Sequence, residues 1–93
     1  MIVGTCRVKL FLHENNSLKG KRKVVKSIKD RVRIKFNVSI AEVDNHDNWK
    51  KIVLGIVTVS NDKKFIHKVL ENVITSIDSM HLAEILDYKI EML

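Results

Sequence analysis

The stretch from Trp49 to Ser60 restricts the possible folds most, because apolar residues occupy both of its alternating sides. One side carries Ile52, Leu54 and Ile56, and the other carries Val53, Gly55, Val57 and Val59. A strand of this kind belongs in the middle of a sheet that is covered on both faces. The chain has 93 residues and no proline, which is enough for one hydrophobic core but too few for two. We therefore expect residues 1–93 to form a single domain.

The residues before this stretch predict a strand, a helix and a second strand. Polar and apolar residues alternate from Ile2 to His13, which predicts a strand with one fully apolar face. A polar turn follows, and Asn16 or Ser17 is expected to cap a helix that runs to about Phe36. Its core-facing residues recur at helical spacing: Leu18, Val25, Ile28 and Val32. The segment from Val38 to Val43 then pairs with the stretch from Trp49 as a hairpin.

Two more elements are predicted after Ser60. A second helix starts after Asn61 and Asp62, carries a wide apolar stripe and ends near Ser79 or Met80. The last segment, from Leu82 to Met92, alternates as a strand with mixed faces. In that alternation Leu82, Glu84, Leu86, Tyr88, Ile90 and Met92 share one side, and Ala83, Ile85, Asp87, Lys89 and Glu91 share the other.

This order of elements, βαββαβ, predicts an α+β ferredoxin-like fold. Right-handed crossovers place both helices on one face of a four-stranded antiparallel sheet, with the first and third strands central. The face without helices then shows Val3, Phe11 and one of the two apolar sets of the Trp49–Ser60 strand. Because exposed apolar surface of this size usually marks an interaction site, we expect a homodimer, and the open sheet face is one candidate for its contact surface.

The positive charge of the chain is concentrated in one segment. Nine of its 17 Lys and Arg residues lie between Lys19 and Lys35, where Asp30 is the one acidic residue, so that window carries a net charge of +8. The formal net charge of the whole chain is only +6. A local positive field of this kind attracts a phosphate backbone, an anionic lipid or an acidic protein surface.

Several blocks of residues resemble the bacterial YlxP-like family. They are Leu18 to Val25 (LKGKRKVV), Phe36 to Val43 (FNVSIAEV), Asp47 to Trp49, Leu54 with Gly55, and Val59 to Asp62. The resemblance spans nearly the whole chain and implies a ferredoxin-like domain. The function of this family is unknown, so the resemblance carries over no catalytic residue. Its genes often lie beside genes for translation initiation and ribosome maturation, which implies an association with RNA or the ribosome.

The basic segment has the chemistry of a phosphate-binding surface. Cations along one helix release the counterions that are condensed on a nucleic acid, and free amides near Lys19 and Gly20 at the helix start favour phosphate as well. The candidate nucleic-acid-binding residues are Lys19, Lys21, Arg22, Lys23, Lys26, Lys29 and Arg33, with Arg31 and Lys35 nearby. The other interpretation is a solvated helix face, although such a face usually mixes Glu with Lys.

The aromatic residues argue against recognition of single-stranded bases. Base stacking on this fold needs aromatic side chains on the two central strands. The chain has Phe11 near the end of the first strand and Trp49 at the start of the third, but no aromatic residue between Lys51 and Ser60. We therefore expect contacts with the phosphate backbone and shape of structured RNA or a ribosomal surface, with no sequence-specific DNA binding.

No enzyme activity, metal or cofactor is expected from the sequence. Asp44, His46 and Asp47 share a turn close to Glu42 and have suitable side chains for a metal, but turns are rich in these residues for backbone reasons alone. The turn after the first strand lacks the glycine and arginine of an acylphosphatase phosphate loop. Cys6 is the one cysteine, and its place among alternating apolar residues indicates a buried structural thiol.

Two other classes of protein were weighed against an RNA-binding protein. A dimeric protein-interaction or small-ligand-binding module is the alternative, although an amino-acid-binding domain of this topology needs a glycine in the turn after the first strand, and Glu14 to Ser17 has none. Membrane attachment is not expected, because the sheet needs the narrow apolar stripe of the basic helix. The sequence lacks a signal peptide pattern and a spanning segment, so we expect a cytoplasmic protein.

Overall fold

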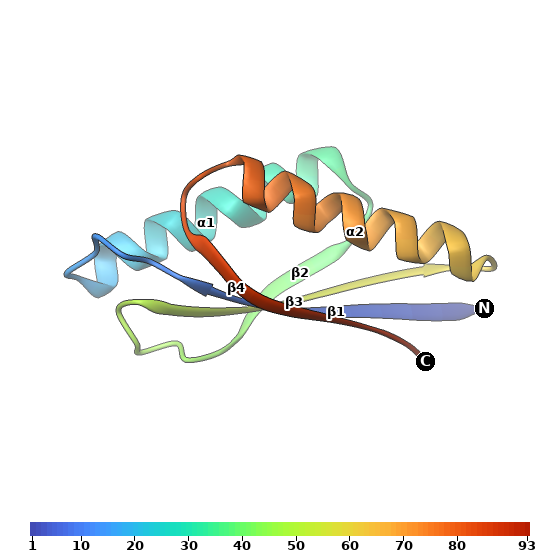
Figure 1. Ribbon diagram of the computed structural model, residues 1–93, viewed down its shortest axis with the longest axis horizontal. Coiled ribbons are helices and arrows are strands. Elements are labelled where there is room, and N and C mark those ends of the chain that lie inside the picture. Colours follow the sequence, from blue (N-terminus) through green and yellow to red (C-terminus); the bar gives the residue numbers. More distant parts are fainter.

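A computed structural model describes all 93 residues, and it confirms the predicted order of elements (Figure 1). The elements are β1 (Ile2–Phe11), α1 (Leu18–Lys35), β2 (Ser39–Asp44), β3 (Lys51–Ser60), α2 (Lys63–Ser79) and β4 (Glu84–Met92). The four strands form one antiparallel sheet in the order β2-β3-β1-β4. The first and third strands are therefore central, and the fold is the predicted ferredoxin-like arrangement.

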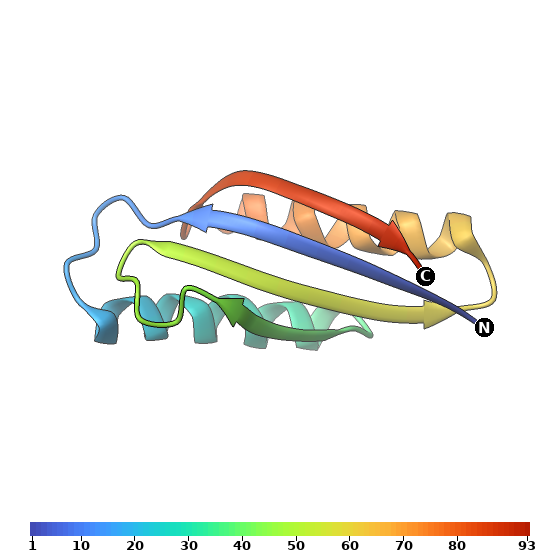
Figure 2. The ribbon, with the colours of Figure 1, turned by 90° about the horizontal axis from the view of Figure 1, so that it is seen from below.

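Both helices lie on one face of the sheet, as predicted, and the other face has no helix (Figure 1). Figure 2 shows this open face, with α1 running behind the β2 side of the sheet and α2 behind the β4 side. The two termini meet at one end, where the backbone N–H of Leu93 donates to the carbonyl of Val3 at 2.8 Å. From the strand order, the two edges of the sheet are β2, which lies beside the basic helix, and β4.

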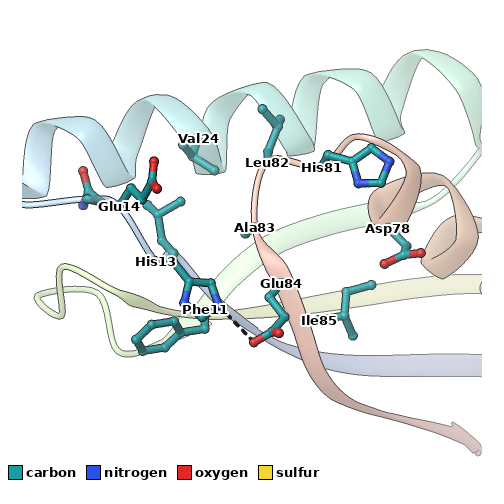
Figure 3. A pocket seen from close by; sticks show the side chains of 12 residues that line it. Phe11, His13, Glu14, Val24, Asp78, His81, Leu82, Ala83, Glu84 and Ile85 are labelled. Atoms are coloured by element: carbon teal, nitrogen blue, oxygen red, sulfur yellow. Dashed lines mark hydrogen bonds and ion pairs between the residues drawn. The ribbon is translucent and has the colours of Figure 1, made fainter.

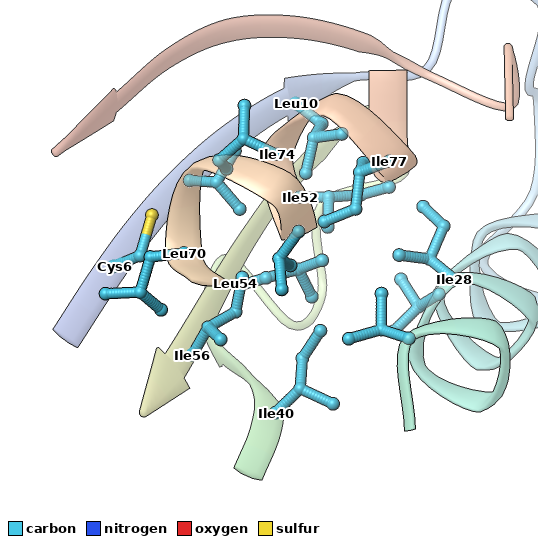
Figure 4. Packing of buried hydrophobic residues seen from close by; sticks show 14 of the residues in the cluster. Cys6, Leu10, Ile28, Ile40, Ile52, Leu54, Ile56, Leu70, Ile74 and Ile77 are labelled. Atoms are coloured by element: carbon cyan, nitrogen blue, oxygen red, sulfur yellow. The ribbon is translucent and has the colours of Figure 1, made fainter. Parts of the chain in front are cut away.

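The core forms between the helices and the sheet residues that point toward them. From the two central strands it takes Cys6, Val8, Leu10, Ile52, Leu54 and Ile56, all of which are buried. Figure 4 shows these side chains packed against Leu70, Ile74 and Ile77 of α2 and Ile28 of α1. This packing settles which apolar set of β3 faces outward, since the alternation leaves Val53, Val57 and Val59 on the open face. Cys6 is buried, as expected.

Three of the predicted strand limits differ in the structure, and a side chain that bonds to the backbone accounts for one of them. Lys50 N–H and Lys51 N–H both donate to Asn48 Oδ1, at 2.9 and 2.8 Å, so β3 begins at Lys51 rather than Trp49. β1 ends at Phe11 rather than His13, and β4 begins at Glu84 rather than Leu82. Helix α1 starts after Ser17, one of the two predicted caps, whose Oγ accepts from Gly20 N–H at 3.0 Å.

The predicted face assignment of the last strand was wrong for its first half. A register shift between Lys9 and Leu10 of β1 places Leu10 opposite Ile85, while Lys9 lies opposite Asp87. The extra residue, Leu86, changes the alternation, as a β-bulge does. Ile85 consequently packs against the core with Ile90, and Leu86 is 54% exposed on the open face.

A candidate nucleic-acid interface

Four of the predicted phosphate-binding residues lie together on one flank of α1. Arg22, Lys26, Lys29 and Arg33 line a surface hollow of about 470 Å³ between α1 and β2, together with Val25, Asp30 and Glu42. Their spacing repeats every three or four residues, so they follow one line along the helix. We call these four residues the basic stripe. They come from a helix whose buried face is Val25, Ile28 and Val32.

Two members of the basic stripe have polar partners and two do not. Lys26 Nζ lies 2.6 Å from Asp30 Oδ2, and this bond, together with nearby cations, lowers the pKa of Asp30. Arg33 donates to the carbonyl of Ile40 on β2 at 3.0 Å. Arg22 and Lys29 make no side-chain hydrogen bond or ion pair within the chain. Their charges are therefore available to an external anion.

The remaining cations of the helix point elsewhere. Lys23, Arg31 and Lys35 are exposed but lie outside the hollow. Lys35 instead borders a smaller hollow with Asn72 of α2, on the other flank of α1. Lys19 is exposed near the start of the helix and also lies outside the hollow. The hollow thus gathers only four of the seven predicted residues.

Lys21 is buried and does not reach the surface of the candidate site, which corrects its predicted role. Its side chain is 1% exposed, and its Nζ lies 2.9 Å from Glu42 Oε2 of β2. It also donates to the backbone carbonyl of Asn45 in the turn between β2 and β3. The residue takes the first position of the spacing 21, 25, 28 and 32, which is the buried stripe of the helix. That spacing is the signal in the sequence from which the burial of Lys21 could have been predicted.

The start of α1 is also less open to phosphate than predicted. Gly20 N–H donates to Ser17 Oγ, and Lys21 N–H donates to Ser17 O at 3.2 Å. Asn15 Oδ1 lies so close to Gly20 that a Cβ atom there would clash with it. The chain itself therefore uses amides at the helix start that were expected to be free for phosphate.

The turn with Asp44 and His46 uses its side chains within the fold. Arg7 Nη2 of β1 lies 3.2 Å from Asp44 Oδ2, and the His46 ring bonds to the carbonyl of Glu42 at 3.1 Å. Nowhere in the 93 residues do three His, Cys, Asp or Glu side chains converge as a set of metal ligands.

The largest hollow of the molecule lies away from the basic stripe (Figure 3). It has a volume of about 560 Å³ and opens between the β1–α1 loop and the segment that leads from α2 into β4. His13 and Glu84, whose side chains meet at 3.1 Å, stand at its edge. Val24, Leu82 and Ile85 supply apolar lining.

The two aromatic residues near the ends of the central strands form no stacking platform. Phe11 contacts the His13 ring, with ring centroids 4.8 Å apart. Trp49 is half exposed in the turn before β3, and its carbonyl accepts from Asn15 Nδ2 at 2.7 Å.

Neither α1 nor α2 is both long enough and apolar enough to cross a lipid bilayer.

The fold and the basic stripe define a small ferredoxin-like domain whose first helix carries a cationic flank. The chain belongs to the family described as "Protein of unknown function (DUF503)", which matches residues 3–90. It is 38% identical over 78 residues to the "Uncharacterized protein YlxP" of Bacillus subtilis (strain 168), an alignment that covers 84% of this chain and 85% of that protein. The resemblance expected from the sequence blocks is thus confirmed.

A solved structure supports the fold independently. The de novo designed protein Foldit4 matches with a TM-score of 0.52 and 17% sequence identity, covering 99% of this chain and 94% of the designed one. At that level of identity the similarity concerns the fold alone.

Proposed function

We propose that this protein binds the phosphate backbone of structured RNA, free or on a ribosomal surface, through the basic stripe. The proposal places it in the cytoplasm and assigns it no catalytic step and no cofactor. The observation that carries the proposal is the convergence of four cations on one flank of α1, over a hollow that they line. The other four surface cations of the helix lie outside this hollow and serve as an internal control for a general charge effect.

The dimensions of the stripe suit a run of consecutive phosphates. Arg22 and Arg33 are eleven residues apart, which corresponds to about 16 Å along an α-helix. Each phosphate that a Lys or Arg neutralises releases a condensed counterion, so four contacts make the affinity steeply dependent on salt. Because no aromatic platform accompanies the stripe, it reads backbone and shape rather than base sequence.

The acidic residues beside the stripe weaken it only in part. Glu42 borders the same hollow, but its carboxylate already pairs with the buried Lys21. Asp30 pairs with Lys26, at an exposed site where such pairs contribute little. A phosphate that approaches Arg22 and Lys29 therefore meets cations without competing partners.

The decisive experiment compares two triple variants of the same helix. One variant changes Arg22, Lys26 and Lys29 to Gln, and the matched control changes Lys23, Arg31 and Lys35 to Gln. Both remove three positive charges from surface positions of α1, where all but the half-buried Lys29 are exposed, but only the first removes them from the hollow. Fluorescence anisotropy with a structured ribosomal RNA fragment should show at least about a tenfold weaker affinity for the first variant, since each lost phosphate contact carries a share of the counterion release.

The control separates a site from a general charge effect. We expect the control variant to bind within about threefold of the natural protein at the same salt concentration, because screened charges away from the contact contribute little. Equal losses in the two variants would contradict the proposal, as would the absence of RNA binding at low salt. Arg33 is kept in both variants because it also bonds to β2.

The proposal includes a homodimer. The open sheet face exposes Val57 and Val59, and the edge strand β4 exposes Leu86 and Tyr88. Surfaces of this kind favour a second copy in a small domain. A molar mass twice that of the chain, measured by light scattering at micromolar concentration, is the expected result. A monomer mass would contradict this part of the proposal.

The alternative function is a dimeric protein-interaction or small-ligand-binding module, and the 560 Å³ hollow is the observation in its favour. Its volume lies in the usual range for small-molecule pockets. A raised unfolding temperature in a screen of metabolites, lost on Leu82→Trp, would support this alternative. A metabolite that binds in this hollow should leave the affinity of the protein for RNA unchanged, because the hollow and the basic stripe share no residue.

A further inference from the structure

The two edges of the sheet differ in how their backbone groups are used. On β2, the carbonyl of Ile40 accepts from Arg33 at 3.0 Å and the carbonyl of Glu42 accepts from His46 at 3.1 Å. Side chains thus cover the short edge, as natural sheets often do to prevent pairing with another chain. The nine-residue strand β4 has no side chain bonded to its backbone.

The outward-facing groups of β4 follow from its pairing with β1. Leu93 N–H donates to Val3 O, and in an antiparallel ladder every second pair exchanges such bonds. Glu91 and Lys89 therefore turn their backbone toward β1. The N–H and C=O groups of the alternate residues, Tyr88 and Ile90, point away from the sheet.

We propose that a second copy of this chain pairs with β4 through its own β4, antiparallel and centred on Tyr88, to give one continuous eight-stranded sheet. This inference rests on the proposed homodimer and specifies its interface. A two-fold axis at Tyr88 brings the whole of Glu84–Met92 alongside its counterpart, with a regular ladder around Tyr88 and the bulged Leu86 of each copy opposite Ile90 of the other. It also places Asp87 of each copy opposite Lys89 of the other, on the same face, where opposite charges attract.

The neighbouring symmetric registers are less favourable for electrostatic reasons. An axis at Asp87 puts two carboxylates opposite each other, and an axis at Lys89 puts two ammonium groups opposite each other, which is destabilising in a sheet. An axis at Ile90 pairs Lys89 with Glu91, but it leaves the first residues of β4 without a partner. Charge complementarity together with the longer stretch of strand brought side by side therefore favours Tyr88.

Helix α2 is self-complementary about the same axis. Tyr88 Oη donates to Glu71 Oε2 at 3.1 Å, so this flank of α2 lies beside β4. Lys64 and Asp78 stand seven residues before and after Glu71, a spacing that keeps them on the same flank. The axis runs α2 antiparallel to its copy, so the Lys64 end of one helix approaches the Asp78 end of the other.

The open sheet face is a poorer site for the second copy. Arg7 pairs with Asp44 there, and Lys9 of the central strand β1 projects from the same face, as do Asp87 and Lys89 of the edge strand β4. Face-to-face contact would remove these charges from water, a cost that often exceeds the gain from pairing them. Edge pairing leaves them hydrated. It also keeps both basic stripes on one side of the sheet, at opposite margins roughly 34 Å apart, which is seven strand spacings.

A charge reversal with rescue tests this pairing. Lys89→Glu places two acidic groups opposite each other at both symmetric positions, and we expect its dimer dissociation constant, measured by sedimentation equilibrium, to rise at least about tenfold. The double variant Asp87→Lys with Lys89→Glu restores opposite charges in the Tyr88 register, and we expect its affinity to return to within about threefold of the natural protein. If the copies paired in the Ile90 register, the dimer of the double variant would stay weak.

A second variant addresses the backbone bonds themselves. Ile90→Pro removes an N–H group that is unused within one copy, and edge strands tolerate proline at such positions. We expect a folded monomer by circular dichroism and sedimentation. A natural protein that is monomeric at high micromolar concentration, a dimer unaffected by Lys89→Glu, or a double variant that fails to recover would overturn the proposed pairing. RNA binding by the basic-stripe variants is measured in a separate anisotropy experiment. A natural protein that is monomeric but still binds RNA would therefore overturn the proposed pairing and leave the proposed RNA function standing.

Discussion

The ammonium group of Lys21 on α1 lies 2.9 Å from the carboxylate of Glu42 on β2, inside a molecule whose other lysines reach water. Glu42 Oε2 is buried. Its distance from Lys21 Nζ is that of an ion pair, but the two groups lack the alignment of a hydrogen bond. Lys21 also bonds to the carbonyl of Asn45, in the turn that precedes β3. One buried cation thus joins the basic helix to the edge strand that forms the opposite wall of its hollow.

Removal of this cation should destabilise the fold. We expect Lys21→Ala to lower the free energy of unfolding by about 3 kcal/mol, because it leaves the buried carboxylate of Glu42 without a partner. Urea unfolding followed by circular dichroism measures the change. The double variant Lys21→Met with Glu42→Leu should lose much less, since both charges disappear together. As a control, Lys19→Ala at an exposed site should change stability by less than about 0.5 kcal/mol; equal effects at both lysines would contradict the burial of Lys21.

Cys6 should react slowly with thiol reagents in the folded protein. Burial, reinforced by the carboxylate of Glu71, raises the pKa of the Cys6 thiol from 9.0 to about 11. At a fixed pH of about 8 the thiolate fraction, which is the reactive form, falls about 100-fold for such a shift. Ellman's reagent should therefore modify the native protein at least that much more slowly than the urea-unfolded chain. Comparable rates in the two states would show that the thiol is accessible and ionised.

The same thiol should make the fold less stable in alkaline solution. The unfolded thiol loses its proton near pH 9, whereas the folded thiol keeps its proton until about pH 11. Unfolding then releases a proton in this interval, so stability falls as pH rises from about 9 to about 11. Urea midpoints measured at several pH values should show this decline, and Cys6→Ala should flatten it. An unchanged slope in that variant would assign the decline to other groups.

Gly4 should be sensitive to the smallest substitution. A Cβ atom at Gly4 would overlap Ile66 Cγ2 and lie 3.2 Å from Leu70 Cδ1, where α2 crosses β1. We expect Gly4→Ala to cost about 1 to 3 kcal/mol of stability through overpacking. Gly55→Ala is the matched control, because its nearest neighbour is the half-exposed Val43 at the end of β2, which can move. A loss at Gly55 as large as the loss at Gly4 would contradict this difference.

Much of the fold was predictable because the hydrophobic pattern is set by packing. The alternation around Cys6 and Val8, the two-sided apolar stretch through Leu54, and the helical spacing of Val25 and Ile28 correspond to buried positions. The bulge at Leu86 was not predictable, because the alternation of the segment reads equally well in either register. The limits of β3 depend on Asn48 bonding to its own turn, which a hydrophobic pattern does not register.

The candidate site was predicted only in outline. Charge density identified the helix that carries the basic stripe, but it could not assign cations to flanks, since that requires the position of β2 beside α1. Arg22, Lys26, Lys29 and Arg33 form the same pattern as the buried stripe, displaced by one residue. Because of this displacement by one residue, Lys21 lies in the core and its neighbour Arg22 lines the hollow.

The salt dependence of RNA binding tests the central claim most directly. With four phosphates neutralised by the basic stripe, the logarithm of the affinity should fall with the logarithm of the salt concentration with a slope of about −3 to −4 on duplex RNA, taking the relation known for duplex DNA. The triple variant of Arg22, Lys26 and Lys29 should reduce that slope to about −1, while the matched control variant should keep it. A slope that is shallow in the natural protein, or that is the same in all three proteins, would contradict the account.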